Sequence, residues 1–217
     1  MFHVPVVKHG INGDLRQKGK IATLACGYGG SSGALISMGA LQMGLHEEEL
    51  PEIIDSWREA NPKIVQYWWD TEKAAMTAYK TGERQEVGKI AFEFYSGTLW
   101  MVLPSGRRLA YLKPKQQPNR FGRMSLTYEG VGQNHKWSRQ ETYSGRLVEN
   151  ATQAIARDIL AEAMDRISAE GLNIVAHVHD EVIIEAPKGQ YTVDEVCKLM
   201  SVNPAWCKGC LLYTSDA

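Results

Sequence analysis

The sequence predicts an α+β fold, in which helices and antiparallel strands occupy separate parts of the chain. Amphipathic helical periodicity dominates the first third of the chain and returns in one long run nearer the C-terminus. Short apolar and β-branched runs, bounded by turn residues, lie between and after these helices. With 217 residues and 44% hydrophobic content, the chain can form one large domain or two small ones.

The helical pattern is found in residues 15–28, 47–60, 64–80 and 140–169. Glycines following Gly27 end the first of these helices. The second has an acidic start, which suits a helix N-terminus. Asn61 and Pro62 separate the second helix from the third, which Gly82 ends.

Strands are predicted at residues 99–103 and 109–112, joined as a hairpin, and at 124–128, after a basic, proline-containing loop at 113–122. A second hairpin is predicted where apolar runs flank His179-Asp180-Glu181, so that Asp180 and Glu181 lie at its tip. Two adjacent carboxylates repel each other, and a hard divalent cation relieves that repulsion. The alternative is an ordinary solvated turn.

The net charge is -1, which does not indicate a nucleic-acid partner for the chain as a whole. Nine Lys and Arg residues against two Glu residues nevertheless lie between Ser105 and Arg146, which indicates one face for a polyanion or a solvated basic loop. The four cysteines include a single Cys-x-x-Cys, so no zinc site is expected. No membrane-spanning segment or signal peptide is expected, and a reduced intracellular setting is favoured.

Two polar stripes stand out on the predicted helices. The first helix carries, at a spacing of four, Arg16, Lys20, Leu24 and Tyr28. A cationic pair followed by an apolar residue and a tyrosine is suited to a triphosphate and a base, or to a plain amphipathic surface helix. Ile21 and Ala25, beside this stripe, are expected to pack inward. The longest helix carries Arg146, Asn150, Gln153 and Arg157, which can contact bases or sugars or bond to neighbouring backbone.

Three elements in this order resemble the family A (DNA polymerase I-like) DNA polymerases: Arg16-x3-Lys20-x7-Tyr28-Gly29, Arg146-x3-Asn150-x2-Gln153 and His179-Asp180-Glu181. Residues 24–35, 103–108, 141–145 and 147–150 are most similar to phage-type members, and the resemblance runs from about residue 4 to 209. It implies a right-hand polymerase fold. Residues 1–139 would form the mostly helical fingers, with a hairpin inserted near 99–112, and 140–209 the C-terminal part of the palm with its catalytic hairpin.

The resemblance implies roles for the residues of the first helix. Arg16 and Lys20 would hold the incoming triphosphate, and Lys20 would also donate a proton to the leaving pyrophosphate. Leu24 would abut the incoming sugar and base. Tyr28, with Gly29 beside it at the DNA, would stack at the templating or nascent pair.

The resemblance also implies roles in the palm. Arg146, Asn150 and Gln153 would touch the minor groove of the primer–template, although Gln153 lies one residue closer to Asn150 than in the common bacterial pattern. His179 would lie near the primer end. Asp180 would bind a catalytic metal, with Glu181 as its acidic partner. The reaction would be template-directed nucleotidyl transfer from a dNTP to a primer 3′-hydroxyl, assisted by two Mg²⁺ ions.

Two further departures from the family pattern lead to expectations. No Asp-x-Ser-type motif with the other metal-binding aspartate precedes Leu15, and thumb and exonuclease regions are missing, so we expect a fragment that is inactive alone. Residues 210–217 resemble translated read-through of a sequencing adapter and are expected to be non-native. The whole protein is expected to be a monomer that acts on primer–template DNA and dNTPs in the cytoplasm of a bacterium or a phage-infected host.

Three other functions stay open. A single-subunit RNA polymerase shares the hand-like fold, but a serine would be expected in place of Glu181. A metal-dependent hydrolase is conceivable because His177-x-His179-Asp180 resembles a metal-binding cluster on a strand. A non-catalytic DNA-binding remnant would carry the same stripes without the chemistry.

Overall fold

The computed structural model describes residues 4, 6, 10, 12–119, 122–132, 134–210 and 212. The chain divides into two compact units, Met1–Met101 with Leu109–Asn150, and Val102–Arg108 with Ala151–Ala217. These units are defined by contacts within the chain, and the functional limits at 139 and 209 remain predictions. Most of the segment expected to be non-native lies outside the described residues, which include only Cys210 and Leu212 of it.

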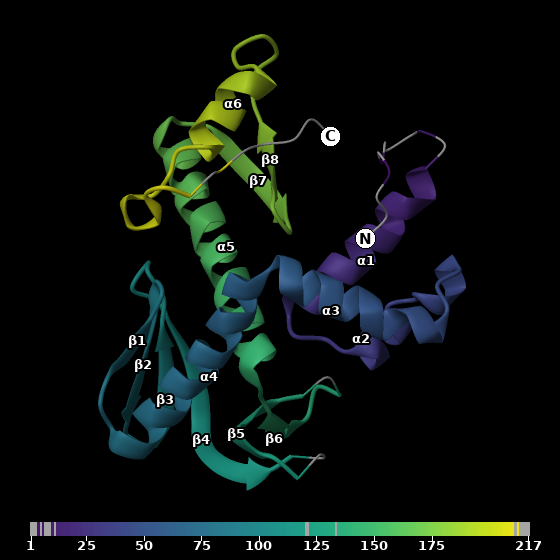
Figure 1. Cartoon of the computed structure of the whole chain (residues 1–217). Coiled ribbons are helices and arrows are strands. Elements are labelled where there is room, and N and C mark those ends of the chain that lie inside the picture. Colours follow the sequence, from purple (N-terminus) through teal and green to yellow (C-terminus); the bar gives the residue numbers. More distant parts are fainter. Residues whose placement is uncertain are drawn as a thin grey trace. The chain divides into compact units, whose positions relative to one another are not determined.

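The first unit opens with a cluster of helices (Figure 1). Their bounds are α1 (Gly13–Gly27), α2 (Ser32–Ser37), η1 (Leu41–Met43), η2 (Glu47–Glu49), α3 (Leu50–Ala60) and α4 (Pro62–Thr81). The core of this cluster is formed by buried residues that include Ile21, Cys26, Leu35, Leu50 and Ile54. The predicted helices are confirmed, except that residues 47–49 form a separate 3-10 turn before α3.

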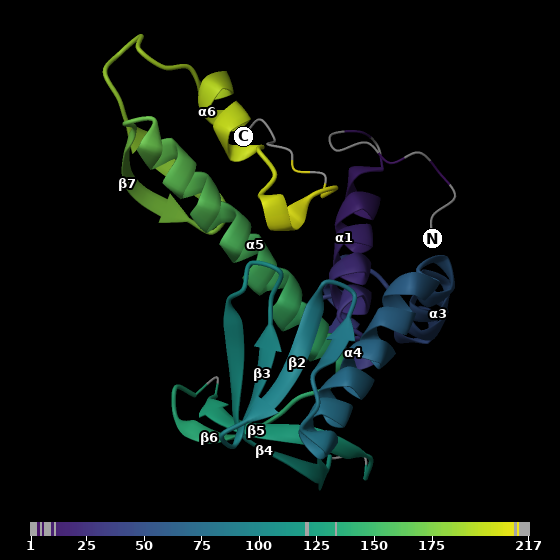
Figure 2. The same cartoon turned by 90° about the vertical axis from the view of Figure 1, so that its left-hand side faces the viewer.

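A six-stranded sheet follows in the same unit, with its strands in sequence order from β1 to β6. The strands are β1 (Gln85–Val87), β2 (Ile90–Tyr95), β3 (Thr98–Val102), β4 (Arg108–Pro118), β5 (Met124–Val131) and β6 (Trp137–Glu141). Helix α4 packs against β1 and β2 (Figures 1 and 2). The predicted hairpin at 99–112 is therefore the middle of a larger sheet, of which β1, β2 and β6 were not predicted.

The predicted loop at 113–122 is wrong, because β4 continues to Pro118. Its pairing with β5 shifts register between Leu112 and Lys115, and Lys113 takes a left-handed backbone conformation with φ +44°. Pro114 lies at this irregularity, where a residue without an N–H group removes no regular ladder bond. The start of the long helix was also predicted too early, since residues 140 and 141 belong to β6.

Helix α5 (Ser144–Ala169) begins in the first unit, and the second unit contains its residues from Ala151 onward. The second unit further contains β7 (Asn173–Val178), β8 (Glu181–Glu185), α6 (Val193–Met200) and η3 (Ala205–Cys207). Strands β7 and β8 pair as the predicted antiparallel hairpin. The Arg166 guanidinium donates to the carbonyls of Leu199 and Val202, at 3.1 and 2.9 Å, and so ties the segment after α6 to α5.

None of the helices in the described part of the chain combines the length and the apolar character that crossing a bilayer requires.

Candidate functional site

Helix α1 presents the predicted cationic stripe to solvent. Arg16 and Lys20 are exposed, and Leu24 retains 43% of its accessible surface. The adjoining face is buried, with Ile21 at 4% and Ala25 at 5% exposure, so both pack inward as predicted. Because one side of α1 packs into the core, the stripe on its other side faces solvent. Two cations and an apolar side chain thus line one accessible face.

An apolar recess lies beside this face, between α1 and α3, with a volume of about 360 Å³. Leu15, Arg16 and Thr23 line it from α1, while Ile53 and Trp57 line it from α3. The recess thus puts apolar surface next to the arginine that begins the cationic stripe. Such a neighbourhood suits a ligand with both an anionic and a flat apolar part.

The C-terminal end of α1 is held in place by close backbone contacts. The Trp68 indole nitrogen donates to the Gly27 carbonyl at 3.1 Å. Gly29 has a φ of +73°, and a Cβ atom on Gly30 would lie only 2.4 Å from the Ala25 carbonyl oxygen. Glycine is thus required at position 30, and the turn that carries Tyr28 has little freedom.

The same turn meets the start of α5. A Cβ atom on Gly145 would lie 1.9 Å from the Tyr28 carbonyl oxygen, so the two backbones are in direct contact. The next residue is Arg146, whose guanidinium carbon lies 6.0 Å from the centre of the Tyr143 ring. The structure therefore brings together Tyr28, Gly29 and Arg146, which belong to two of the three predicted elements.

Asn150 lies one turn further along α5, and its side-chain amide is partly occupied. Its Nδ2 atom donates to the Tyr111 hydroxyl at 3.0 Å. Tyr111 is buried at 2% exposure and packs edge-to-face on Tyr128, with ring centres 5.0 Å apart. Burial raises the pKa of Tyr111 to about 12, since the phenolate would lose its hydration. Asn150 thus has a fixed amide with one bond directed into the protein.

The tip of the β7–β8 hairpin carries the predicted acidic pair in the second unit. Val178 pairs with Glu181, so that His179 and Asp180 form the turn. His179 has a φ of +53°, a left-handed conformation that is uncommon for a residue with a side chain. Asp180 and Glu181 are both exposed. The turn therefore holds the predicted acidic pair outward, at the cost of local backbone strain.

A metal-binding role for His177 is disfavoured by its neighbour on α5. The guanidinium nitrogens of Arg157 lie 3.3 Å from Nδ1 and 3.2 Å from Nε2 of the imidazole. Both ring nitrogens thus face a cation, which opposes binding of a second cation. Within the described residues, no group of three or more His, Cys, Asp or Glu side chains is placed to hold a metal ion.

The exposed carboxylates fit Mg²⁺ by their chemistry. Mg²⁺ prefers oxygen ligands and is commonly held by one or two carboxylates, with water and substrate phosphates completing the shell. Asp180 and Glu181 supply such oxygens from adjacent positions at the tip of the β7–β8 hairpin. Gln153, also in the second unit, is exposed on α5.

One polar cluster was not predicted from the sequence. The Asp158 carboxylate on α5 accepts from the Ser105 hydroxyl and from Nε of Arg107, each at 2.5 Å. Arg107 also donates to the Ala154 carbonyl at 2.8 Å. This cluster fastens the tip of the β3–β4 hairpin to α5 within the second unit. Its only sequence signal was a Ser-Gly-Arg turn, which does not identify its partner.

Comparison with known proteins adds one relative. The chain is 50% identical over 220 residues to a protein named "DNA polymerase" from Bacillus phage SP02. The alignment covers the whole chain and 34% of the phage protein, so the chain spans about a third of the length of this curated relative. No protein-family model matches the chain, and no solved structure matches it.

Proposed function

We propose that the chain supplies the fingers and the C-terminal part of the palm of a family A DNA polymerase of phage type. The observation that carries this proposal is the similarity to the phage DNA polymerase along the whole chain. The exposed stripe of α1 and the acidic hairpin tip support it, because both present the expected side chains outward. In the proposed right-hand fold, the substrates are primer–template DNA and dNTPs.

In this function, the α1 face receives the incoming nucleotide. Arg16 and Lys20 donate charge-assisted hydrogen bonds to the triphosphate, and Lys20 provides a proton to the leaving pyrophosphate. Leu24 contacts the sugar and base through apolar surface. Tyr28 stacks at the templating or nascent pair, in a position that its contact with Gly145 restricts.

The primer–template lies along the polar stripe of α5 in this proposal. Arg146 contacts the backbone or minor-groove edge, while Asn150 keeps hydrogen-bonding capacity beyond its bond to Tyr111. Gln153 extends the stripe, and His179 lies near the primer end. Asp180 and Glu181 would hold Mg²⁺, which when bound supplies Lewis-acid stabilisation of the charge that develops in phosphoryl transfer.

The proposed nucleotide binding by the α1 face can be tested with the chain itself. A fluorescent dNTP analogue would be titrated against the chain and against Lys20→Ala. Lys18→Ala is the matched control, since Lys18 lies on the same helix with its ammonium directed toward Gly44. We expect Lys20→Ala to weaken binding about tenfold or more, the loss of a charged hydrogen bond. Equal affinities for the two variants would contradict the assignment.

Catalysis is tested with the longer protein. The source DNA would be sequenced across both ends of this reading frame, and the protein that it encodes would be assayed for primer extension. We expect an upstream aspartate motif in frame and extension that Asp180→Asn abolishes. Extension that survives this substitution would refute the role of Asp180.

A further inference from the structure

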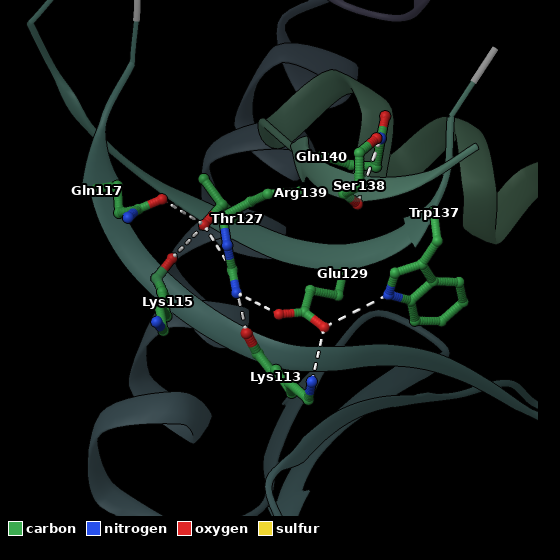
Figure 3. A network of polar contacts seen from close by, with 9 residues as sticks. All are labelled: Lys113, Lys115, Gln117, Thr127, Glu129, Trp137, Ser138, Arg139 and Gln140. Atoms are coloured by element: carbon green, nitrogen blue, oxygen red, sulfur yellow. Dashed lines mark hydrogen bonds and ion pairs between the residues drawn. The ribbon is translucent and has the colours of Figure 1, made fainter. Parts of the chain in front are cut away.

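One face of the sheet combines an exposed aromatic ring with a set of cations. On neighbouring strands β4, β5 and β6, the residues that share this face include Lys115, Thr127, Glu129, Trp137 and Arg139 (Figure 3). Trp137 retains 59% of its accessible surface on β6, which is an edge strand of the sheet. A large ring that is this exposed at a sheet edge has little role in packing the core.

A polar network holds this face in one arrangement. Glu129 accepts from Lys113 at 2.8 Å and from Arg139 at 3.1 Å, and its Oε2 atom also accepts from the Trp137 indole nitrogen at 3.4 Å (Figure 3). Arg139 in turn donates to the Lys113 carbonyl at 3.1 Å. Hydrogen bonding to Lys113 lowers the pKa of Glu129, which keeps this carboxylate ionised. The indole is therefore oriented by a bond to its edge, while its ring face stays available.

The charge of the face remains positive despite Glu129 and Glu141, because Lys113, Lys115 and Arg139 outnumber these two acids. Two cations share that one carboxylate, so the pair of Lys113 and Arg139 is only half neutralised. Lys115 is exposed on β4, and Lys136 is exposed in the hairpin turn directly before Trp137, at the edge of this face. Within the described residues, neither ammonium has an ion-pair partner. A backbone hydrogen bond from the Gly132 N–H to the Lys136 carbonyl, at 2.9 Å, closes the β5–β6 hairpin and so positions Lys136 and Trp137.

From this arrangement we propose that the β4–β5–β6 face binds single-stranded DNA, with a base stacked on Trp137 and phosphates near Lys115 and Lys136. Stacking on an aromatic ring, with cations along the backbone, is how proteins bind single strands without reading their sequence. A double helix shields its base faces, so it would not use the exposed ring. The inference rests on the proposed function only in naming the template strand as the biological ligand.

The test uses the full chain and a short fluorescein-labelled oligothymidine, with fluorescence anisotropy as the readout. Trp137→Ala removes the ring, whereas Trp137→Phe keeps a stacking surface and loses only the bond to Glu129. Trp69→Ala is the matched control, because Trp69 is 46% exposed but lies on α4. We expect Trp137→Ala to weaken binding about fivefold or more, and Trp137→Phe to keep most of the affinity.

The cations are tested by salt dependence. A double variant with Lys115→Gln and Lys136→Gln would be compared with a control double variant that has Lys63→Gln and Lys188→Gln, which are exposed elsewhere. For a single strand, each lost phosphate contact makes the negative slope of log affinity against log salt shallower by about 0.7, so the double variant should be shallower by about 1.4. The control variant should keep the slope of the original chain.

Three outcomes would overturn the proposal. The first is an equal effect of Trp137→Ala and Trp69→Ala. The second is a blunt duplex that binds as tightly as the single strand. The third is an oligo-glutamate peptide that binds as tightly as DNA regardless of Trp137, which would indicate an acidic protein partner instead. The dNTP titration with Lys20→Ala is independent of all three, so failure of the polymerase assignment can be recognised separately.

Discussion

The Asp158 carboxylate is expected to stabilise the second unit more than any exposed acid on the same helix. Asp158→Ala removes the acceptor of two hydrogen bonds, from Ser105 and Arg107. The Asp158 side chain is only 11% exposed, whereas that of Arg107 is 44% exposed. The partly buried bond from Ser105 to a charged group contributes about 1.5–3 kcal/mol. The half-exposed ion pair contributes about 0.5–1 kcal/mol, because water partly replaces it.

Together these contributions predict that Asp158→Ala lowers the free energy of unfolding by about 2–4 kcal/mol. The measurement is urea-induced unfolding followed by circular dichroism, with amide hydrogen exchange to localise the effect. Exchange should accelerate in the hairpin tip, where the Leu103 N–H bonds to the Arg107 carbonyl at 2.8 Å. Asp165→Ala is the matched control, since Asp165 is exposed on the same helix.

A double-mutant cycle separates the direct interaction from other effects. Arg107→Ala and Asp158→Ala are made singly and together, and their coupling should be about 1 kcal/mol. Asp165→Ala should change the free energy of unfolding by less than about 0.5 kcal/mol. The reasoning is refuted if Asp158→Ala costs no more than Asp165→Ala, or if the cycle gives no coupling.

Three further predictions concern the first unit. Gly145→Ala should destabilise the chain by about 1–3 kcal/mol in thermal unfolding, because its Cβ would overlap the Tyr28 carbonyl oxygen, whereas Gly27→Ala, with open space around it, should not. Equal melting temperatures would contradict this. Tyr111 has an ordinary pKa of 10.0 and a folded pKa of about 12, so its stabilising effect is present below pH 10.0 and is lost as pH rises through about 12. The loss should amount to about 2–3 kcal/mol in the free energy of unfolding. Urea unfolding measured across this pH range should show the loss for the original chain but not for Tyr111→Phe. An equal pH dependence of the two proteins would disprove the reasoning. If the longer protein is the proposed polymerase, Leu24→Tyr should relax its discrimination against dideoxynucleotides, since a hydroxyl near the missing 3′-hydroxyl can bond where leucine cannot. Equal incorporation ratios for the two variants would count against this.

The helical part of the first unit could be predicted from the sequence, because its periodicity reflects one buried face. In α1, the spacing predicted that Ile21 and Ala25, beside the stripe of Arg16 and Lys20, pack inward, and the exposures agree. The β7–β8 hairpin was predictable for a similar reason, since two apolar runs flank a polar turn. In both cases a local pattern determines which side chains face outward.

The sheet was harder to predict, because its strands depend on partners rather than on local pattern. Prolines 114 and 118 indicated a loop, yet β4 accommodates the first at its irregular pairing and ends at the second. Strand β6 carries polar residues at most positions, and its pairing with β5 comes partly from the bond between Arg139 and Glu129. Such contacts between strands cannot be inferred from the local sequence pattern of either strand.

Helices α1 and α5 meet through backbone atoms, at Tyr28 and Gly145. This contact joins the cationic stripe of α1 to the polar stripe of α5 more tightly than side-chain packing would. Because the Tyr28 carbonyl oxygen occupies the space that a side chain at position 145 would need, no rotamer change can absorb a displacement there. Tyr28, at the end of the cationic face, and Arg146, at the start of the polar stripe, must then move together. If α1 binds the nucleotide and α5 the DNA, as proposed, a change at position 145 should therefore disturb both at once, although Gly145 presents no side chain to either ligand.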